Sequence, residues 1–353
     1  MIATGRAAQA AALLQARVDA NRAGLLVRLT LQKALIATGD AAAALALARE
    51  TALMHPGAAP AATGLGEALR AAGYLPTAIA EFQRAMRLDP DLDAARIGLG
   101  SAWLDAGEAE KALDAWRALN QHASDVLTGK IAEAESVLRQ QRCDPRYVRH
   151  LFDQFAGDYE SRMLDQLHYR APAILRQLVE FIGVPADKTH TILDLGCGTG
   201  LMGQAVQAWA TRLDGVDLSP AMIEKSRRRG IYDELWTEDI CVWLATTHGA
   251  YDLIFAADSV VYLGDLAPLF AGAARRLACG AHFLFTLEKK DGEGFELGPK
   301  RRWRHSENYL RAEAKNAGLT LAGAMECQPR TEGGLPVAGL AVALAKNVSA
   351  NPA

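Results

Sequence analysis

The chain has 353 residues, of which half are apolar, and its formal net charge is −3. This length and composition provide enough material for two ordinary domains with buried cores. The near-neutral charge excludes a strong overall attraction to nucleic acid or to an anionic membrane, and no segment is apolar for the roughly 20 residues that a membrane helix needs. We therefore expect neither nucleic acid nor a membrane as a partner.

The five cysteines are scattered along the chain, without a C-x-x-C pair or the spacing of metal ligands: Cys143, Cys197, Cys241, Cys279 and Cys327. Such spacing predicts free thiols in a reducing cytoplasm and no metal site. The alanine-rich start, residues 1–20, lacks the continuous apolar segment of a signal peptide and carries charges at intervals that suit a helix.

A repeat with a period of 34 residues runs through copies at 25–58, 59–92 and 93–126. Gly73 and Gly107 fall where one helix would turn into the next, and Ala78 and Ala112 are small where two helices would touch. This pattern resembles the tetratricopeptide repeat, a solenoid of helix pairs. The resemblance implies an N-terminal repeat domain over residues 1–143, covered at its end by a helix at 123–141.

The function of this repeat domain stays open between two alternatives. Its concave surface would hold a peptide or a partner protein, as in other short solenoids. Alternatively, the array only packs against the rest of the chain or forms a homodimer.

From residue 144 to residue 346 the pattern changes to short apolar runs that alternate with helical stretches. Four such runs, followed by polar or helical segments, predict a parallel sheet with helices on both faces: 191–195, 212–216, 251–256 and 282–287. Two last runs, 319–326 and 337–345, are joined by a connection that is too short for a parallel crossover. They predict an antiparallel hairpin at the end of the sheet.

A glycine-rich loop follows the first of these strands, in the stretch TILDLGCGTGLMG from Thr191 to Gly203. Its last six letters also satisfy the fingerprint G-x-G-x-x-G, which would indicate NAD. However, the string DLGCGTG from Asp194 to Gly200, together with the closing hairpin, resembles the class I S-adenosylmethionine-dependent methyltransferases. That resemblance implies a Rossmann-like domain with a mostly parallel seven-stranded sheet, S-adenosyl-L-methionine as cofactor and S-adenosyl-L-homocysteine as product.

The same resemblance implies a set of cofactor-binding residues. Asp217 ends the second strand about 20 residues after the loop, where a carboxylate accepts both ribose hydroxyls. Asp239 would contact the adenine amine, with the N-cap of a helix as its alternative role. The other members implied near the methionine, ribose or adenine are Asp194, Gly196, Cys197, Gly198, Gly200, Leu218, Met222, Ile240 and Asp258.

Two further segments are expected around the methyl acceptor. The loop after the fourth strand offers Ser259 and Tyr262, next to Asp258. Residues 147–172 resemble a helical lid, also present in malonyl-carrier-protein and quinone methyltransferases. In this lid the aromatic side chains would either close over the substrate or belong to the core, and Arg170 would meet an anionic group; the aromatic candidates are Tyr147, Phe155, Tyr159 and Tyr169.

A basic segment after the fifth strand holds the remaining candidates. Arg302 would fork onto a carboxylate, and His305 would act as a base or, alternatively, help cap the following helix. Glu288, at the tip of the fifth strand, and Tyr262 are the other catalytic candidates. The second basic run, from Lys225 to Arg229, is expected to be a solvated helix face.

Taken together, these segments resemble the bacterial predicted methyltransferases that carry tetratricopeptide repeats before the catalytic domain. The implied activity is methyl transfer to a small-molecule acceptor such as a carboxylate or a carrier-bound acyl group. One alternative is a protein methyltransferase whose repeats recruit its target. Another is a cofactor-binding assembly factor without turnover. A short tail, 347–353, would follow the domain.

Overall fold

The computed structural model describes residues 7–20, 22–117, 119 and 125–347, and the chain divides into two compact units between Gln140 and Gln141. Most of the expected tail, and the start of the helix expected at 123–141, lie outside the described residues.

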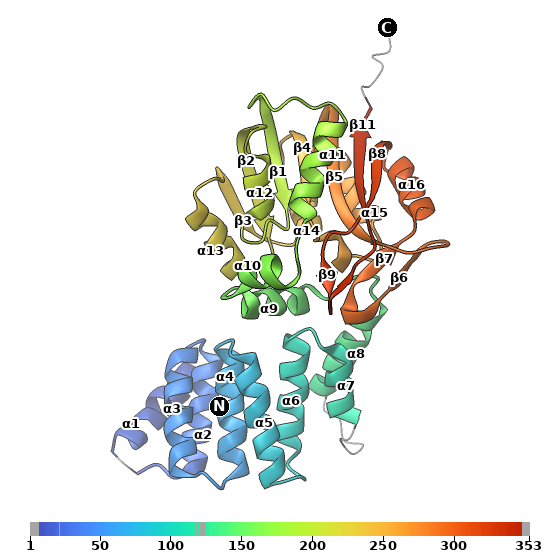
Figure 1. The fold of residues 1–353 in the computed structure, drawn as a ribbon. Helices are drawn as coiled ribbons and strands as arrows, with labels where there is room; N and C mark the ends of the chain where they lie inside the picture. Colours follow the sequence, from blue (N-terminus) through green and yellow to red (C-terminus); the bar gives the residue numbers. More distant parts are fainter. Residues whose placement is uncertain (1–6, 21, 118, 120–124, 348–353) are drawn as a thin grey trace. The chain divides into compact units, whose positions relative to one another are not determined.

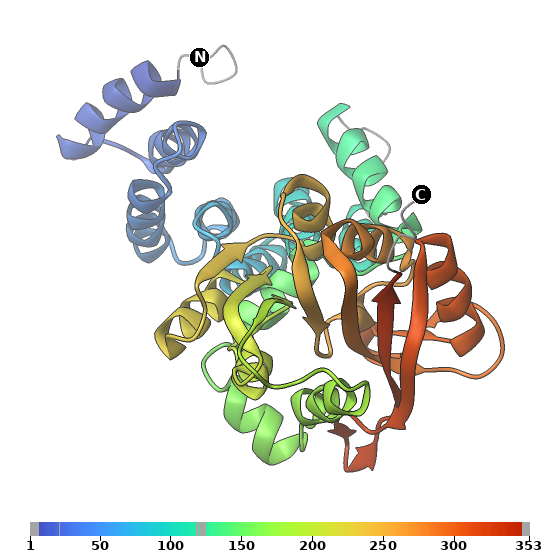
Figure 2. The same ribbon diagram turned by 90° about the horizontal axis from the view of Figure 1, so that it is seen from above.

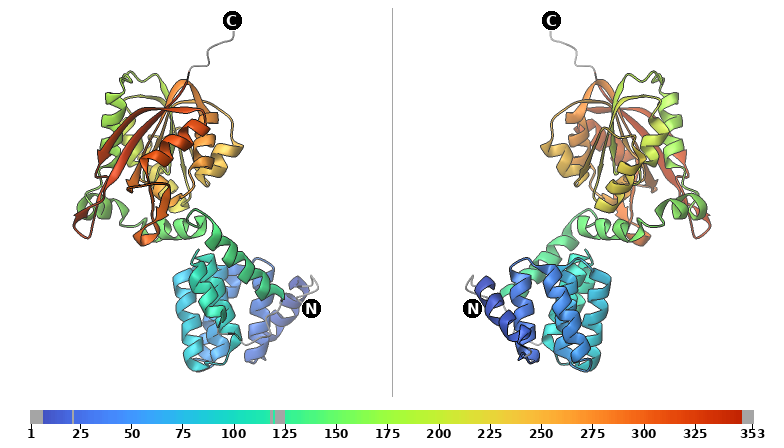
Figure 3. Two further views of the ribbon diagram at one scale, coloured as in Figure 1. Left: turned by 90° about the vertical axis from the view of Figure 1, so that its right-hand side faces the viewer. Right: turned by 90° about the vertical axis from the view of Figure 1, so that its left-hand side faces the viewer.

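The first unit consists of helices that recur in pairs (Figure 1). The first helices of the three pairs begin at Leu25, Ala59 and Asp93, 34 residues apart, and the second helices keep the same interval. Figure 3 shows these helices, coloured blue to cyan, lying alongside one another. The helices of this unit are α1 (Ala7–Asp19), α2 (Leu25–Ala37), α3 (Ala41–Met54), α4 (Ala59–Ala71), α5 (Leu75–Leu88), α6 (Asp93–Asp105), α7 (Ala109–Arg117) and α8 (Asp125–Arg139).

Small residues let these helices approach closely around two large aromatic side chains. Phe82 is fully buried, and a Cβ added to Gly66 would lie 2.8 Å from its ring. A Cβ on Gly100 would likewise collide with Trp116, which packs with Leu127 of α8. The helix pairs recur with the expected period, and α8 follows the last pair. The tetratricopeptide assignment itself stays a prediction.

The second unit is built on a twisted sheet in the order β3-β2-β1-β4-β5-β11-β8. The first five of these strands are parallel, and β11 is antiparallel to both of its neighbours, β5 and β8. The expected mostly parallel sheet with an antiparallel end is thus present. Its strands are β1 (His190–Leu195), β2 (Ala210–Asp217), β3 (Glu234–Thr237), β4 (Tyr251–Ala256), β5 (Leu277–Lys289), β8 (Leu319–Cys327) and β11 (Gly339–Lys346).

Helices cover both faces of this sheet, and Figure 2 shows the green α11 and the red α16 on opposite sides of it. Side chains alternate between the two faces along each strand. Ile192 packs toward α11, whereas Leu193 packs toward α14 and α15. The helices are α11 (Ala171–Phe181), α12 (Leu201–Val206), α13 (Pro220–Arg229), α14 (Ile240–Thr246), α15 (Ala267–Arg276) and α16 (Glu307–Asn316).

Short elements complete the unit near the carboxyl ends of the parallel strands. The lid expected at 147–172 contains α9 (Pro145–Phe155), α10 (Tyr159–Ser161) and the π-helical turn η2 (Arg162–Gln166). The sequence patterns did not indicate the remaining elements, which are η3 (Val260–Tyr262), β6 (Phe295–Leu297), η4 (Pro299–Arg301), β7 (Trp303–His305), β9 (Thr331–Glu332) and β10 (Leu335–Pro336). Within the described residues, no helix combines the length and the apolar character needed to cross a membrane.

Candidate active site

A pocket of about 830 Å³, including solvent at its mouth, opens at the carboxyl ends of β1, β2 and β4. This is where open α/β sheets bind their ligands. One side of the pocket, which we call the loop side, is formed by Gly196, Gly198, Asp217, Leu218, Asp239 and Ile240. Another, which we call the cluster side because it adjoins a cluster of charged residues, is formed by Tyr159, Asp258, Ser259, Tyr262 and Arg302. The remaining wall residues are Arg142, Cys143, Val148, Phe152, Met163, Ala257 and Leu263.

On the loop side, Asp217 is fixed by two backbone donors. Its Oδ2 accepts the N–H of Gly198 at 2.9 Å, and its Oδ1 accepts the N–H of Ser219 at 2.8 Å. Burial raises the pKa of Asp217 to about 6, against these two hydrogen bonds, which favour the charged form. The carboxylate is therefore held in position at the edge of the pocket.

The glycines of the loop allow close approach for two different reasons. Gly198 has a φ of +55°, and a Cβ added there would meet no protein atom within 4 Å. Because Gly198 lines the pocket, that open space is where a ligand would lie. A Cβ on Gly196 would lie only 2.5 Å from the Cβ of Ser259, whose hydroxyl donates to the carbonyl of Leu195 at 2.9 Å.

Cys197 lines a smaller cavity next to the pocket, together with Gly198 and the lid residues Tyr159 and Tyr169. The Tyr169 hydroxyl donates to the carbonyl of Ala257 at 3.3 Å. This cavity connects the glycine loop with the lid.

Three residues expected to bind the cofactor lie behind the loop rather than in the pocket wall. Asp194 is fully buried and accepts the hydroxyl of Tyr232 at 2.6 Å. Burial raises the pKa of this carboxyl to about 7. Gly200 faces Tyr232 and Arg229, and Met222 is fully buried in α13.

Asp239 lines the pocket and also plays the alternative role considered from the sequence. Its Oδ1 caps α14 by accepting the N–H groups of Cys241 at 2.9 Å and Val242 at 3.1 Å. Its Oδ2 forms an ion pair with Arg142.

The segment from Gln141 to Asp144 forms a wall that the sequence analysis missed. The N–H of Cys143 donates to the carbonyl of Tyr262 at 2.8 Å, and the carbonyl of Gln141 accepts the N–H of Gly264 at 2.9 Å. These hydrogen bonds hold residues 141–144 beside η3. Nothing in the sequence pattern of Arg142 and Cys143 indicated this placement, because the pairing is with residues more than a hundred positions away.

The lid contributes some of the expected aromatic residues to the pocket and not others. Tyr159 lines it, together with Phe152 and with Met163, of which only Met163 was not considered from the sequence. Phe155 instead lies under the guanidinium of Arg162, at 4.2 Å from its ring centroid. Tyr147 lies under the guanidinium of Arg301, at 4.9 Å. Arg170 is one of the residues that line a separate groove beside β8 and β11.

Polar contacts hold this lid against α13. The Ser219 hydroxyl donates to Asp153 at 2.5 Å, and Lys225 donates to the carbonyl of Gly157 at 3.0 Å. Arg229 pairs with Glu160 and also donates to the carbonyl of Thr199 in the glycine loop at 2.8 Å. The expectation that the run Lys225–Arg229 is only solvated is therefore wrong for its first and last members.

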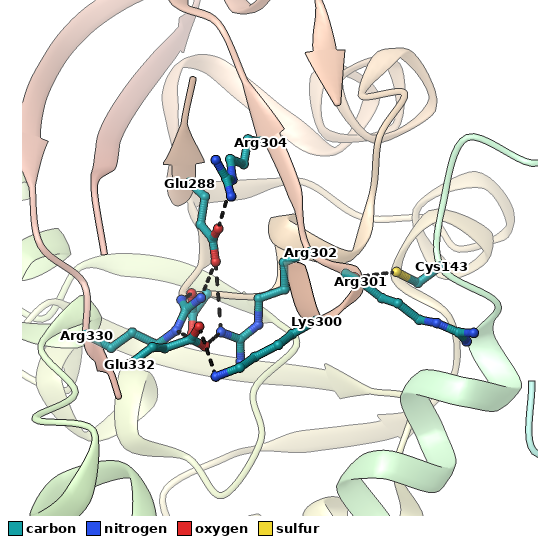
Figure 4. Close-up of polar contacts among 9 residues, drawn as sticks. Cys143, Glu288, Lys300, Arg301, Arg302, Arg304, Arg330 and Glu332 are labelled. Atoms are coloured by element: carbon teal, nitrogen blue, oxygen red, sulfur yellow. Dashed lines mark hydrogen bonds and ion pairs between the residues drawn. The ribbon is translucent and has the colours of Figure 1, made fainter. Parts of the chain in front are cut away.

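The cluster side is organised around Arg330, whose side chain is completely buried. Arg330 forms ion pairs with Asp258, at the end of β4, and with Glu288, at the end of β5. Its Nε lies 3.6 Å from Glu332, which also pairs with Arg302. We call these five residues, Asp258, Glu288, Arg302, Arg330 and Glu332, the charged cluster; Figure 4 shows its contacts with Lys300 and Arg304.

Arg330 is the main residue that the sequence analysis missed. It lies between Pro329 and Thr331, in a connection interpreted only as a turn. The Arg330 side chain holds the ends of two strands together, which no local pattern reports.

Two catalytic candidates are not in the pocket wall. His305 is fully buried, and its Nε2 lies 2.9 Å from the carbonyl oxygen of Gly264. Burial lowers its pKa to about 4, and Ser306, not His305, caps α16. The Glu288 carboxylate forms an ion pair with Arg330, and burial raises the pKa of Glu288. The structure therefore gives no support to His305 or Glu288 as a base, because neither reaches the pocket.

Within the ranges that the structure describes, no group of three or more His, Cys, Asp or Glu residues is arranged to hold a metal ion.

Comparison with known proteins identifies part of the second unit. Residues 192–280 match the family model described as "Methyltransferase domain". The chain is 28% identical over 164 residues to the 18S rRNA (guanine-N(7))-methyltransferase of Bos taurus, covering 45% of this chain and 55% of that protein. It is 41% identical over 108 residues to trans-aconitate 2-methyltransferase of Escherichia coli O1:K1, covering 30% and 41%.

Among solved structures, magnesium protoporphyrin IX methyltransferase from Synechocystis PCC 6803, with bound S-adenosylhomocysteine, matches with a TM-score of 0.45 and 17% identity. The match covers 57% of this chain and 99% of that one. The chain spans about half the length of the curated relatives that it matches.

Proposed function

We propose that this chain is an S-adenosylmethionine-dependent methyltransferase that methylates a carboxylate oxygen of a small acceptor with an apolar body. The match of residues 192–280 to a methyltransferase domain supports the activity. The arrangement of the pocket supports the acceptor. The alternative is that the methyl acceptor is a protein recruited by the repeats, and the experiment below distinguishes the two acceptors.

The loop side of the pocket fits the cofactor. Asp217 presents a fixed carboxylate for two ribose hydroxyls, and Gly198 leaves free the space that a side chain would fill. Leu218 and Ile240 provide apolar surface beside Asp239 for the adenine ring. When bound, S-adenosylmethionine supplies an electrophilic methyl carbon on a positively charged sulfur.

The cluster side fits an acceptor that is apolar with one anionic group. Arg302 is the cation of the cluster side, and Phe152, Met163 and Leu263 supply apolar surface elsewhere in the pocket wall. A guanidinium can form two parallel hydrogen bonds to a carboxylate, which orients the bound acid. A carbon chain or ring would then lie against the aromatic and aliphatic side chains.

The observation that carries this proposal is that every carboxylate of the pocket wall is already engaged. Asp217 accepts two backbone N–H groups. Asp239 caps α14 and pairs with Arg142, and Asp258 pairs with Arg330. These contacts hold all three carboxylates in place, and with ribose bound to Asp217 we infer that none of the three removes a proton from a hydroxyl or an amine.

The other titratable groups of the wall do not suit this task either. Burial raises the pKa of Tyr159 well above its usual range and that of Tyr262 to about 12. It raises the pKa of the Cys143 thiol to about 11. An acceptor carboxylate needs no base, because it is ionised near neutral pH and already carries the lone pair that forms the new bond. As the oxygen–methyl bond forms, the sulfur–methyl bond would break and its electron pair would stay on sulfur, so that S-adenosylhomocysteine leaves as a neutral thioether. The carboxylate and sulfonium charges cancel, and no proton moves.

The test uses the chemical stability of the product. The full-length protein is incubated with methyl-labelled cofactor and a panel of carboxylic acids, each paired with the corresponding amide and alcohol. We expect label only with the acids, in products that release methanol in dilute alkali, as methyl esters do. Arg302→Met should abolish labelling, and the exposed Arg311→Met should leave it unchanged.

Other outcomes contradict the proposal. Alkali-stable label in an amide or an alcohol would show that the pocket contains a base we have not identified. Label in protein when a lysate is added would favour the alternative in which the repeat unit recruits the acceptor.

The proposal also includes a cytoplasmic location, because the five cysteines are free thiols, as in a reducing compartment.

A further inference from the structure

Arg302 is already occupied, and its partner comes from a hairpin that the proposed activity leaves unexplained. Glu332 pairs with Arg302 and lies 3.3 Å from the ammonium of Lys300. The Glu332 carboxylate thus sits on the cation that the proposed function assigns to the acceptor.

The element that carries Glu332 is small and exposed at its tip. Strands β9 and β10 form a two-stranded hairpin with Gly333 and Gly334 at its turn, both with positive φ. Gly333, Gly334, Leu335 and Pro336 are exposed. Glycines at both turn positions suit a tight hairpin turn.

Backbone bonds tie the base of this hairpin to the end of the lid. The N–H of Thr331 donates to the carbonyl of Leu167 at 2.7 Å, and the N–H of Arg170 donates to the carbonyl of Pro329 at 2.7 Å. The hairpin is therefore attached to the lid on one side and to Arg302 on the other.

The ion pairs of the charged cluster indicate which of its three carboxylates an incoming acid could displace from its arginine. Asp258 and Glu288 pair with Arg330, whose side chain is completely buried, so that removing either would leave a buried cation short of a partner. Glu332 is more exposed, at 23% of its side chain, and its distance to the Nε of Arg330 is 3.6 Å. An incoming carboxylate can replace Glu332 on Arg302 while the buried pairs remain.

We propose that Glu332 is an intramolecular competitor for the carboxylate site, and that the β9–β10 hairpin thereby lowers the affinity with which Arg302 binds an acceptor that carries a negative charge. This inference rests on the proposed function. An anion gains the Arg302 contact as Glu332 moves out to solvent, where it is well hydrated. A neutral acceptor does not compete with Glu332 for Arg302, so its binding should not depend on the charge at position 332.

Two isosteric probes, benzoate and benzamide, test this inference, because they differ in charge and hardly in shape. Full-length protein saturated with S-adenosylhomocysteine is titrated with each probe by calorimetry. Glu332→Gln keeps the shape of the side chain but removes the competing charge. We expect it to bind benzoate roughly threefold to tenfold more tightly than wild type, with benzamide unchanged.

Two further variants separate the possible failures. Glu326→Gln is the matched control, because Glu326 is an exposed carboxylate of β8 that pairs with Lys289 outside the pocket, and it should behave as wild type. Arg302→Met should lose the preference for benzoate. Weaker benzoate binding by Glu332→Gln would overturn the inference, because Glu332 would then position Arg302 instead of competing for it.

The remaining outcomes are equally decisive. If Arg302→Met loses benzoate binding and Glu332→Gln does not change it, the competitor role is wrong and the carboxylate acceptor survives. If wild type binds benzoate no better than benzamide and neither variant changes this, the carboxylate acceptor itself fails, and the competitor role fails with it.

Discussion

On the loop side of the pocket, Asp217 accepts the N–H of Gly198, 19 residues earlier, and that of Ser219, two residues later. On the cluster side, Arg330 pairs with Asp258 at a separation of 72 residues, and Arg302 pairs with Glu332 of the β9–β10 hairpin. The loop side is held by backbone donors whose position follows from one strand-loop-strand segment. The cluster side is held by charges that meet only when the whole sheet has formed.

This difference has a chemical counterpart. Backbone donors fix one geometry, which suits a ligand that is always the same. Ion pairs between side chains can exchange partners, which suits a site where the chain's own carboxylate gives way to that of an acceptor. Substitutions on each side should therefore affect one ligand and leave the other, and four of them test this separation.

The largest effect is expected for Gly198→Val, which should reduce S-adenosylhomocysteine binding below detection by calorimetry. The added side chain would occupy the open space in the loop side of the pocket. Gly230→Val is the matched control, because Gly230 also has a positive φ and an open surround but ends α13 outside the pocket wall. If both variants lose binding equally, backbone strain and not ligand overlap explains the loss.

Arg330→Met should damage the cluster side instead. The change leaves Asp258 and Glu288 buried without their cation, and removing one partner of a buried ion pair typically costs about 3–5 kcal/mol. We expect a loss of this order in the free energy of unfolding by urea, and loss of benzoate binding in the protein that remains folded. The double variant Arg330→Met with Glu288→Gln should recover part of the stability. Unaltered stability would show that Arg330 carries little of the network.

Asp217→Asn should weaken S-adenosylhomocysteine binding by roughly one order of magnitude, because a charge-assisted contact to ribose becomes a neutral one. Since burial raises the pKa of Asp217 to about 6, wild-type affinity should also fall as the pH decreases through 6. The same shift makes the charged form costly in the folded state, so the contribution of Asp217 to unliganded stability improves as pH falls from 6 toward 4.

The Asn variant should show neither of these pH dependences from this site. Asp233→Asn is the control, since Asp233 also accepts a backbone N–H, from Leu213, away from the pocket. A pH dependence that persists in Asp217→Asn would assign the titration to another group, such as Asp194.

The smallest effect is expected for Arg229→Met. This arginine joins the glycine loop to Glu160 of the lid, so its removal should speed the dissociation of S-adenosylhomocysteine by a few-fold in stopped-flow measurements. Arg228→Met, at an exposed position on the same helix, should have no effect. Benzoate binding to the saturated protein should stay unchanged. An equal effect of both variants would show that overall helix charge matters and the lid contact does not.

The sequence predicted the elements whose causes are local. Thr191 to Gly203 shows the buried strand and the turn that needs glycine at positive φ, and the closing strands are paired antiparallel as their short connection requires. The place of Asp217, at the end of the strand that follows the glycine loop, has the same local cause, and its role in ribose binding stays a proposal. The cluster was not predicted, because nothing near Arg330 in the chain reveals the two strand ends that it joins.

The wrong expectations have the same physical origin. His305 was a candidate base because its segment follows the fifth strand and could fold over the cleft, but β7 pairs with β5 and the His305 side chain turns inward onto Gly264. Phe152 lines the pocket, whereas Phe155 lies under the guanidinium of Arg162 and Tyr147 under that of Arg301. Which member of an amphipathic lid reaches the pocket depends on the helix rotation, which the tertiary contacts decide.

The insertion of β11 between β5 and β8 has a consequence for how the chain is made. This strand occupies an interior place in the sheet although residues 339–346 come after every other strand in the sequence. During synthesis, β8 has no partner in the sheet until these residues leave the ribosome, and its edge stays open to other chains until then. The helical repeats, whose contacts are between neighbours in sequence, can fold while the sheet still waits for its last strand.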